Sequence, residues 1–381
     1  MELVWATEDL VIAGQPYAGL PILLWDSMES CVPANLFFRH YLLRGAIGSK
    51  RSWPSTGRAL YDFFSFLQFH ELDWRDVDRG EAKSLVAAYR DYCLVTCGLA
   101  RNTVRQRLTY ICKFYEFALT ERWVGHLPFA YEERSVRREV GLLTHLDASG
   151  GKILANDVMP RSHKALPGFL SMTEIRSLLA AAENPHHRMM IRLALHTGLR
   201  REELAAFPLA YVFDPDQAGR PERNLRIKLN PFDGSGMVTK GSKQRSIFVS
   251  RQFMSELFRY VTKVRGERAN LSKNAQKALF LNKAGDRYGD DGKSLNRIIS
   301  ETGKRAGIKV HTHMLRHTYA THTLLSLQRT PASGLDPLVF VQRQLGHTSI
   351  QTTLVYLHLV NEMADEAVLA YDDELNALGD G

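Results

Sequence analysis

Hydrophobic residues recur with a helical period over a first stretch of the chain, from residue 33 to about residue 130. Short breaks, such as residues 45–54, divide this stretch into several predicted helices. The clearest helix begins at Asn102, a residue type that favours the N-cap position. Its apolar face consists of Val104, Leu108, Ile111, Cys112, Tyr115, Ala118 and Leu119. Residues 1–32 show no clear period, so the pattern assigns them no role.

A second stretch combines helices with a small sheet. Ser171 and Glu174 form an S-x-x-E capping box before an apolar helix. The next helix is predicted from Asn184 to Gly198, with Gly198 as its C-terminal cap. Residues 224–250 contain two alternating runs separated by glycines, which predicts an antiparallel pair of strands. Helices resume after this pair and continue almost to the C-terminus.

A polar segment with several arginines, including Arg134, Arg137 and Arg138, separates the two stretches. Such a composition is typical of an interdomain linker. We therefore predict a fold that is mainly α, with a small antiparallel β-sheet in the second domain. The expected parts are an N-terminal extension over 1–32, a helical domain over 33–130, a basic linker over 131–168, a second domain over 169–360 and an acidic helix or tail over 361–381.

Charge is unevenly distributed along the 381 residues, a length that favours two domains. The net charge is +8, but seven acidic residues and no Lys or Arg follow residue 358, so residues 1–358 carry +15. Such an excess suits a phosphate backbone, and an ordinary basic surface is the alternative. On the helix predicted from Asn102, several cations lie off the apolar face and are available to solvent or DNA. They are Arg101, Arg105, Arg107 and Lys113.

Cysteine usage and the N-terminus bear on the compartment. Cys31, Cys93, Cys97 and Cys112 show no C-x-x-C spacing and are interpreted as small core residues. The first residues lack the features of a secretory signal, and no apolar run approaches the length of a membrane span. We expect a cytoplasmic protein with no membrane partner.

The second domain contains the groups needed to attack a phosphodiester with a protein side chain. Such a reaction requires an in-line nucleophile, positive charge on the non-bridging oxygens, and a proton for the leaving oxygen. A phenol, two guanidinium groups, an ammonium and two imidazoles occur in separate motifs along this domain. In chain order, they are Arg200, Lys240, His313, Arg316, His347 and Tyr356.

The histidines also raise the possibility of a metal site. His313 and His317 are four residues apart and could face one ion from a single helix. Met314 stands where a zinc protease motif carries Glu, and no acidic third ligand follows nearby. We predict no metal ion and no other cofactor.

In this order, the motifs resemble the catalytic domain of the tyrosine recombinase (phage integrase) family. The resemblance covers residues 169–360 closely and residues 33–130 loosely, where it suggests the helical core-binding domain of the family. It implies a two-domain DNA clamp and a site-specific DNA recombinase of the integrase or transposase type. Such an enzyme cuts and rejoins DNA through a 3′-phosphotyrosine intermediate and a Holliday junction, without a cofactor.

The resemblance also implies a role for each motif. Tyr356 would be the nucleophile, Lys240 the general acid, and His313 the group that moves the Tyr356 proton. Arg200 and Arg316 would hold the phosphate, and His347 would bond to one of its oxygens. Glu203 would support the site, whereas His317 is expected to serve in packing. Lys243, on the same turn as Lys240, is expected to contact DNA, as are Arg137 and Arg138. Residues Arg201 and Thr239, and the long spans 205–236 and 327–337, depart from the usual pattern.

Two other functions are compatible with parts of this pattern. A type IB topoisomerase-like enzyme would use this set to relax DNA, and a non-catalytic DNA-binding relative would have lost part of it. The L-G-H-x-S-I-x-T-T-x-x-Y motif that ends at Tyr356 favours a recombinase, and we lean towards a mobile genetic element as its source. The expected partners are double-stranded DNA, further copies of the chain in a tetramer on two paired sites, and partner recombinases or accessory proteins. The tail from about residue 361 is predicted to be a helix that docks on a neighbouring protomer.

Overall fold

A computed structural model describes residues 1–44, 50–135, 152–161, 166–329, 335–357 and 359–360. The chain divides into two compact units, Met1–Lys164 and Ala165–Gly381. The tail expected over residues 361–381 lies outside the described residues, as do Arg137 and Arg138. Within the described part, no helix is both long enough and apolar enough to cross a membrane.

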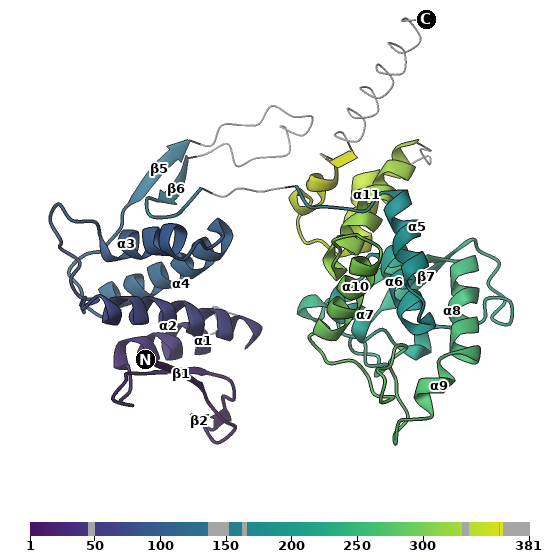
Figure 1. The fold of residues 1–381 in the computed structure, drawn as a ribbon, viewed down its shortest axis with the longest axis horizontal. Coiled ribbons are helices and arrows are strands. Elements are labelled where there is room, and N and C mark those ends of the chain that lie inside the picture. The colour runs from purple at the N-terminus through teal and green to yellow at the C-terminus, as the bar shows by residue number, and fades with distance from the viewer. Residues whose placement is uncertain (45–49, 136–151, 162–165, 330–334, 358, 361–381) are drawn as a thin grey trace, which may run out of the picture. The chain divides into compact units, whose positions relative to one another are not determined.

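In the described part of the N-terminal unit, the α-helices α1 to α4 form the core (Figure 1). Their bounds are Val32–Leu43 for α1, Trp53–Phe69 for α2, Leu85–Asp91 for α3 and Arg101–Thr120 for α4. The helix α2 packs against α4, and aromatic rings fill the space between the helices. Phe114, for example, meets Phe37 and Phe64 edge-to-face, at centroid distances of 5.8 Å and 5.4 Å. Such pairs favour a single packing arrangement of the core.

The predicted start and face of α4 need two corrections. The helix begins at Arg101, and its N-cap is Ala100 rather than Asn102. The N–H of Thr103 already bonds to the carbonyl of Ala100, so the first turn closes without a side-chain cap. Leu119, predicted on the buried face, is 36% exposed. Near this end of the helix, the unit buries Phe114 and Phe117 instead.

Short antiparallel strand pairs complete the N-terminal unit. The strands are Glu2–Trp5 (β1), Val11–Ile12 (β2), Gln15–Pro16 (β3), Pro21–Leu24 (β4), Tyr131–Ser135 (β5) and Lys152–Asn156 (β6). β1 pairs with β4 and packs on α2, which gives residues 1–32 a structural role that the sequence pattern does not reveal. β5 pairs with β6 inside the segment that was expected to be a linker.

Most of the C-terminal unit is helical (Figure 1). Its α-helices are Met172–Ala181 (α5), Pro185–Thr197 (α6), Arg201–Ala205 (α7), Arg251–Lys263 (α8), Gly266–Ala269 (α9), Lys293–Arg305 (α10), Thr312–Arg329 (α11) and Pro337–Leu345 (α12). Residues 351–357 are also helical. The predicted capping box of Ser171 and Glu174 is confirmed, as are the N-cap Asn184 and the C-cap Gly198 of α6. The long α11 packs against α6 and α12.

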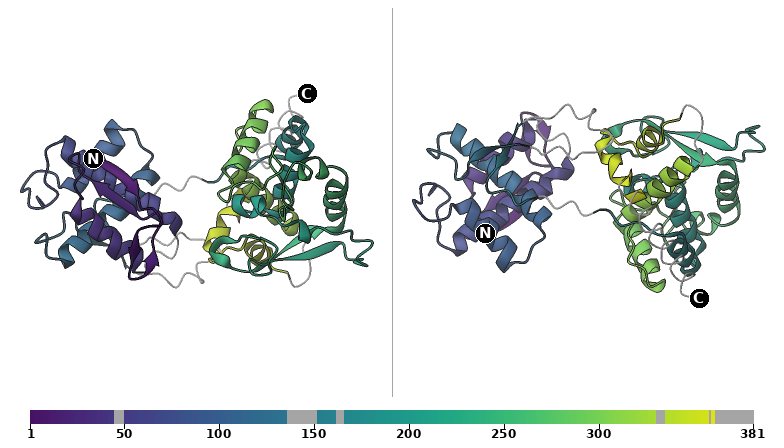
Figure 2. Two further views of the ribbon diagram at one scale, coloured as in Figure 1. Left: turned by 90° about the horizontal axis from the view of Figure 1, so that it is seen from below. Right: turned by 90° about the horizontal axis from the view of Figure 1, so that it is seen from above.

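One antiparallel hairpin lies in the C-terminal unit, formed by Asn224–Leu229 (β7) and Arg245–Ser250 (β8) (Figure 2). In β7, every second residue is buried, because Leu225, Ile227 and Leu229 face the core. In β8, Ile247 and Val249 do the same. The predicted fold class, mainly α with a small antiparallel sheet, is confirmed.

Candidate active site

Arg316 occupies the interior of the C-terminal unit and is held by main-chain oxygens. It belongs to α11 and is only 1% exposed. Its Nη1 donates to the carbonyl of Gly198 at 2.6 Å, and its Nη2 donates to the carbonyl of Leu345 at 2.7 Å. These carbonyls belong to the C-terminal ends of α6 and α12. The guanidinium group is therefore fixed between two helix ends.

Arg200 reaches the same region from the start of α7, two residues after Gly198. Its Nη2 donates to the carbonyl of Gly346 at 3.1 Å. Because Leu345 and Gly346 are consecutive, the carbonyls that hold Arg316 and Arg200 bring the two guanidinium groups together. Burial, and then the charge of Arg200, lower the pKa of Arg316 to about 9. The two cations thus lie close enough to repel each other.

Glu203 anchors this arrangement from within the core, where it is 1% exposed. It accepts from Nη1 of Arg200 at 3.1 Å and from both Nη atoms of Arg245 at 2.5 Å and 2.6 Å. Burial by itself would raise the pKa of Glu203, but the hydrogen bonds and charge of Arg245, with the charge of Arg200, lower it. Sequence reasoning missed Arg245. The alternation of β8 could have indicated its inward position, because Arg245 lies on the same face of the strand as the buried Ile247 and Val249.

Tyr356 lies in the helical segment 351–357 and is 1% exposed. Its Oη lies 3.0 Å from Nδ1 of His317, on α11. The structure therefore places His317 at the phenol, where the sequence predicted His313 as the partner and a packing role for His317. Burial raises the pKa of Tyr356, and the charges of Arg316 and Arg200 oppose that rise. The phenol is thus protonated at neutral pH.

The other two predicted histidines flank this pair. The ring of His313 lies 4.4 Å from the ring of His317, one helical turn away. The ring of His347 stacks near that of Tyr356 at 6.2 Å, and its Nδ1 lies 3.0 Å from Oγ1 of Thr353. Burial and then the charge of Arg316 lower the pKa of His347 to about 3 and the pKa of His313 to about 4. Both imidazoles are therefore neutral at pH 7.

Lys240 opens a short helical turn, Lys240–Ser242, between β7 and β8. Gly241, at φ 67°, has the left-handed conformation that lets the chain reverse there. Lys240 and Lys243 are both exposed. Burial is the largest cause of the lowered pKa of His313, and the charge of Lys240 is the smallest.

Three of the four cationic side chains on α4 that were predicted to contact DNA form ion pairs or hydrogen bonds within the protein. Arg107 Nη2 pairs with Asp62 at 2.6 Å, and Arg105 donates to the carbonyl of Pro160. Lys113 Nζ forms an ion pair with Glu116, one turn later, at 2.7 Å. Arg101 is exposed. Their contact with DNA stays a prediction.

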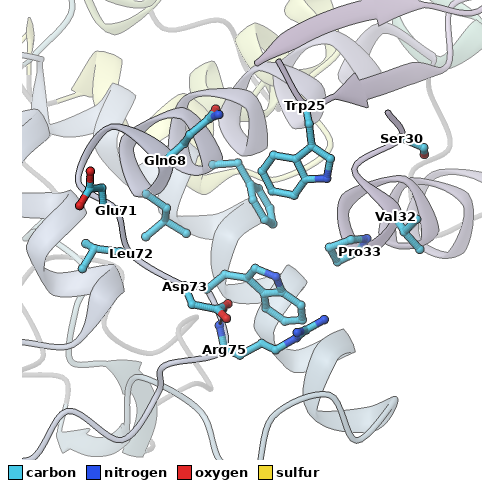
Figure 3. Close-up of a pocket in the computed structure, with 12 residues that line it drawn as sticks. Trp25, Ser30, Val32, Pro33, Gln68, Glu71, Leu72, Asp73 and Arg75 are labelled. Atoms are coloured by element: carbon cyan, nitrogen blue, oxygen red, sulfur yellow. Dashed lines mark hydrogen bonds between the residues drawn. The ribbon is translucent and has the colours of Figure 1, made fainter. Parts of the chain in front are cut away.

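A hollow of about 500 Å³ lies in the N-terminal unit (Figure 3). Trp25, Trp74 and Arg75 are among the residues that line it, and the guanidinium of Arg75 lies over the ring of Trp74 at 5.2 Å. It contains no predicted catalytic residue. Among the described residues, no group of three or more His, Cys, Asp or Glu is arranged to hold a metal ion.

The convergence of Arg200, Arg316 and Tyr356 can be compared with known proteins. The model of the phage integrase family matches residues 168–363, which is slightly more than half of the chain. The chain belongs to the phage integrase family. This match contains all six predicted catalytic residues, and it lies within the C-terminal unit.

Two tyrosine recombinases are similar in sequence to this chain over most of its length. Tyrosine recombinase XerA from Pyrococcus horikoshii is 27% identical over 288 residues, which cover 71% of this chain and 88% of that protein. Tyrosine recombinase XerD from Rickettsia conorii is 25% identical over 344 residues, which cover 88% of this chain and 96% of that protein.

Solved structures of a site-specific recombinase and an integrase share the fold. The XerH site-specific recombinase, in a post-cleavage complex with its palindromic difH substrate, has a TM-score of 0.57 at 16% identity, covering 90% of this chain and 86% of that one. A lambda integrase dimer bound to a COC′ core site has a TM-score of 0.54 at 13% identity, covering 84% of this chain and 92% of that one. The predictions of a tyrosine recombinase and of a site-specific DNA recombination enzyme are confirmed, and the topoisomerase alternative is not favoured.

Proposed function

We propose that this recombinase cuts DNA by direct attack of the Tyr356 phenol on a phosphodiester. The phenolic oxygen would bond to phosphorus and displace the 5′-oxygen, which leaves a 3′-phosphotyrosine and a free 5′-hydroxyl. Because the bond energy is conserved in this intermediate, a 5′-hydroxyl from another strand can reverse the step and seal the DNA. Two rounds of such exchange, through a Holliday junction, would complete recombination.

The observation that carries this proposal is the surplus of positive charge beside a buried phenol. Glu203 brings one negative charge to Arg200, Arg245 and Arg316, and it pairs most closely with Arg245. The remaining positive charge of Arg200 and Arg316 suits a phosphodiester, because its two non-bridging oxygens can accept paired hydrogen bonds from a guanidinium group. The same charge would stabilise the additional negative charge of the transition state.

Lys240 and His347 would complete the reaction. The ammonium of Lys240, exposed on its turn, would give a proton to the departing 5′-oxygen. His347, which lies just before the helical segment 351–357, would donate a hydrogen bond to a phosphate oxygen. His313, near the charges of Lys240 and Arg200, would take a place on the phosphate side of the site.

We also propose how the whole chain acts on its substrate. The two units would hold double-stranded DNA between them as a clamp, with Arg101 on α4 and Lys243 beside Lys240 among the DNA contacts. The net charge of +15 over residues 1–358 supports binding to a phosphate backbone. Four copies would assemble on two paired sites, and partner recombinases or accessory proteins could join them.

The proposed nucleophile is tested by Tyr356→Phe, which removes one oxygen atom and leaves the cationic surface unchanged. On a suicide substrate nicked near the cleavage site, wild-type protein should form a covalent complex that survives denaturing electrophoresis. The Phe variant should form none, while its affinity for the same duplex stays within a few-fold of wild type. Covalent trapping by the variant at the wild-type level would contradict the proposal.

A further inference from the structure

The hydroxyl of Tyr356 has a specific partner that the motif-based assignment of roles leaves unused. Among the described residues, the hydrogen-bond partner of its Oη is Nδ1 of His317, at 3.0 Å. Tyr356 is 1% exposed, so bulk water has little access to the phenol. The two residues come from different elements, α11 and the segment 351–357, 39 positions apart in the chain. Their contact therefore depends on the packed site and not on sequence proximity.

We propose that His317, and not His313, accepts the proton of Tyr356 when the phenol attacks DNA. This inference rests on the proposed role of Tyr356 as nucleophile. The proton would pass from Oη to Nδ1 of His317 while Oη bonds to phosphorus. The bond between phosphorus and the 5′-oxygen would break, and that oxygen would take its proton from Lys240. Religation would return each proton to its origin, so the cycle needs no other acid or base.

The surroundings of His317 keep its ring neutral and able to accept a proton. His313 and Arg316 act on it from its own helix, His311 acts on it from just before that helix, and Tyr356 faces it from the segment 351–357. Burial, then the charges of His313 and Arg316, lower the pKa of His317 to about 3. With the ring proton on Nε2, Nδ1 presents a lone pair to the phenol.

Arrival of DNA would make His317 a better base. A phosphate between Arg200 and Arg316 would offset part of the charge of Arg316, which is one of the causes that lower the pKa of His317 besides burial, and the pKa of the ring would rise. The same phosphate would weaken the effect of the guanidinium charges on Tyr356. Proton transfer therefore has to accompany formation of the bond between Oη and phosphorus, which removes the negative charge that a free phenolate would carry.

His313 is less suited to this task. More of its surface is open to solvent than that of His317, which is half-buried against the phenol. The charges that act on His313 include those of Arg200 and Lys240, the groups proposed to surround the phosphate. We therefore expect His313 to act on the side of the phosphate, whereas Nδ1 of His317 lies 3.0 Å from the nucleophile.

The test uses His317→Gln, His317→Ala and the matched control His313→Gln in the full-length chain. A glutamine amide can hydrogen-bond to the phenol but cannot take up its proton at neutral pH, so this variant separates positioning from proton transfer. Single-turnover cleavage of the nicked suicide substrate is measured from pH 6 to pH 9.5. Binding to uncleaved duplex confirms that each variant is folded.

Both His317 variants should cleave roughly 10²- to 10³-fold more slowly than wild type at pH 7. The deficit should shrink as pH rises, because hydroxide then deprotonates the phenol, and added imidazole should partly restore His317→Ala. His313→Gln should slow cleavage without this pH signature. The inference is wrong if His317→Gln cleaves at the wild-type rate, if the deficit is independent of pH and of imidazole, or if His313→Gln alone shows the signature. Absence of covalent complex with wild-type protein would instead contradict the proposed function itself.

Discussion

Arg316 takes its orientation from main-chain carbonyls, whereas Arg200 is held by a main-chain carbonyl and by the carboxylate of Glu203. The carbonyl oxygens of Gly198, Leu345 and Gly346 fix the direction of both guanidinium groups without neutralising them. An arginine has five N–H donors, so each side chain keeps donors for a ligand after these contacts are made. At the residue scale, the site is therefore prepared for an anion before any DNA binds.

Replacement of Lys240 by Ala should slow cleavage about 10²- to 10⁴-fold, because the 5′-oxygen then leaves without a proton. A substrate with sulfur in place of that oxygen should restore the rate, since a thiolate needs little protonation to depart. The rate is measured in single-turnover reactions on both substrates.

Two further variants serve as controls for this prediction. Arg200→Ala should not be rescued by the sulfur substrate, because its proposed role is to stabilise charge on the non-bridging oxygens. Lys243→Ala, on the same turn, should cleave both substrates alike. If sulfur rescues the Lys243 variant and not the Lys240 variant, the general acid has been assigned to the wrong lysine.

Motif order proposed Arg200, Arg316 and Tyr356 as members of one site, and the structure groups them. Their individual contacts could not be predicted from the sequence. The contact between His317 and Tyr356 depends on how the segment 351–357 approaches α11, which no local pattern encodes. The bidentate pair of Arg245 with Glu203 likewise joins a strand to a helix across the core.

At the element scale, helix ends place the two arginines of the proposed active site. Gly198 ends α6 with a φ of 61°, and Gly346 ends α12 with a φ of 64°. Both conformations favour glycine, and both turns expose carbonyls that an α-helix leaves without internal partners. The two arginines use these carbonyls as acceptors, so the geometry of the site depends on how the helices terminate.

Gly198→Ala should destabilise the C-terminal unit. Besides adopting a left-handed conformation, the new Cβ would lie 2.5 Å from the ring of Tyr319 and 2.9 Å from Leu345. We expect a loss of about 2–5 kcal/mol in the free energy of unfolding and a fall of roughly 5–15 °C in the melting temperature. Gly266→Ala, where a Cβ meets nothing within 4 Å, should change little. Equal melting temperatures for the two variants would contradict this account of the α6 cap.

Local sequence patterns were sufficient to predict several helix ends. The capping box of Ser171, the N-cap of α6 and its terminal glycine are local signals, and all three appear as predicted. The pairing of β1 with β4 was not predicted, because these strands are four residues long and their pairing joins positions about 20 residues apart. Such pairs are stabilised by packing on α2, which the pattern of a single strand does not reveal.

At the scale of the whole molecule, the proposed chemistry relies on protein cations where many nucleases use metal ions. Cleavage of the suicide substrate should therefore proceed in excess EDTA and without ATP, at a rate within a few-fold of that in magnesium. Arg316→Ala should lose activity in both buffers. A strict requirement for a divalent ion would contradict the proposed role of the two arginines and would favour the alternative that His313 and His317 bind a metal.

The central claim, attack by Tyr356 on DNA, is tested most directly by locating the protein–DNA bond. Wild-type protein is trapped on the nicked substrate, both components are digested, and the modified peptide is sequenced by mass spectrometry. A nucleotide joined through its 3′-phosphate to Tyr356 is the predicted result. A bond to another residue, or a linkage through a 5′-phosphate, would contradict the account.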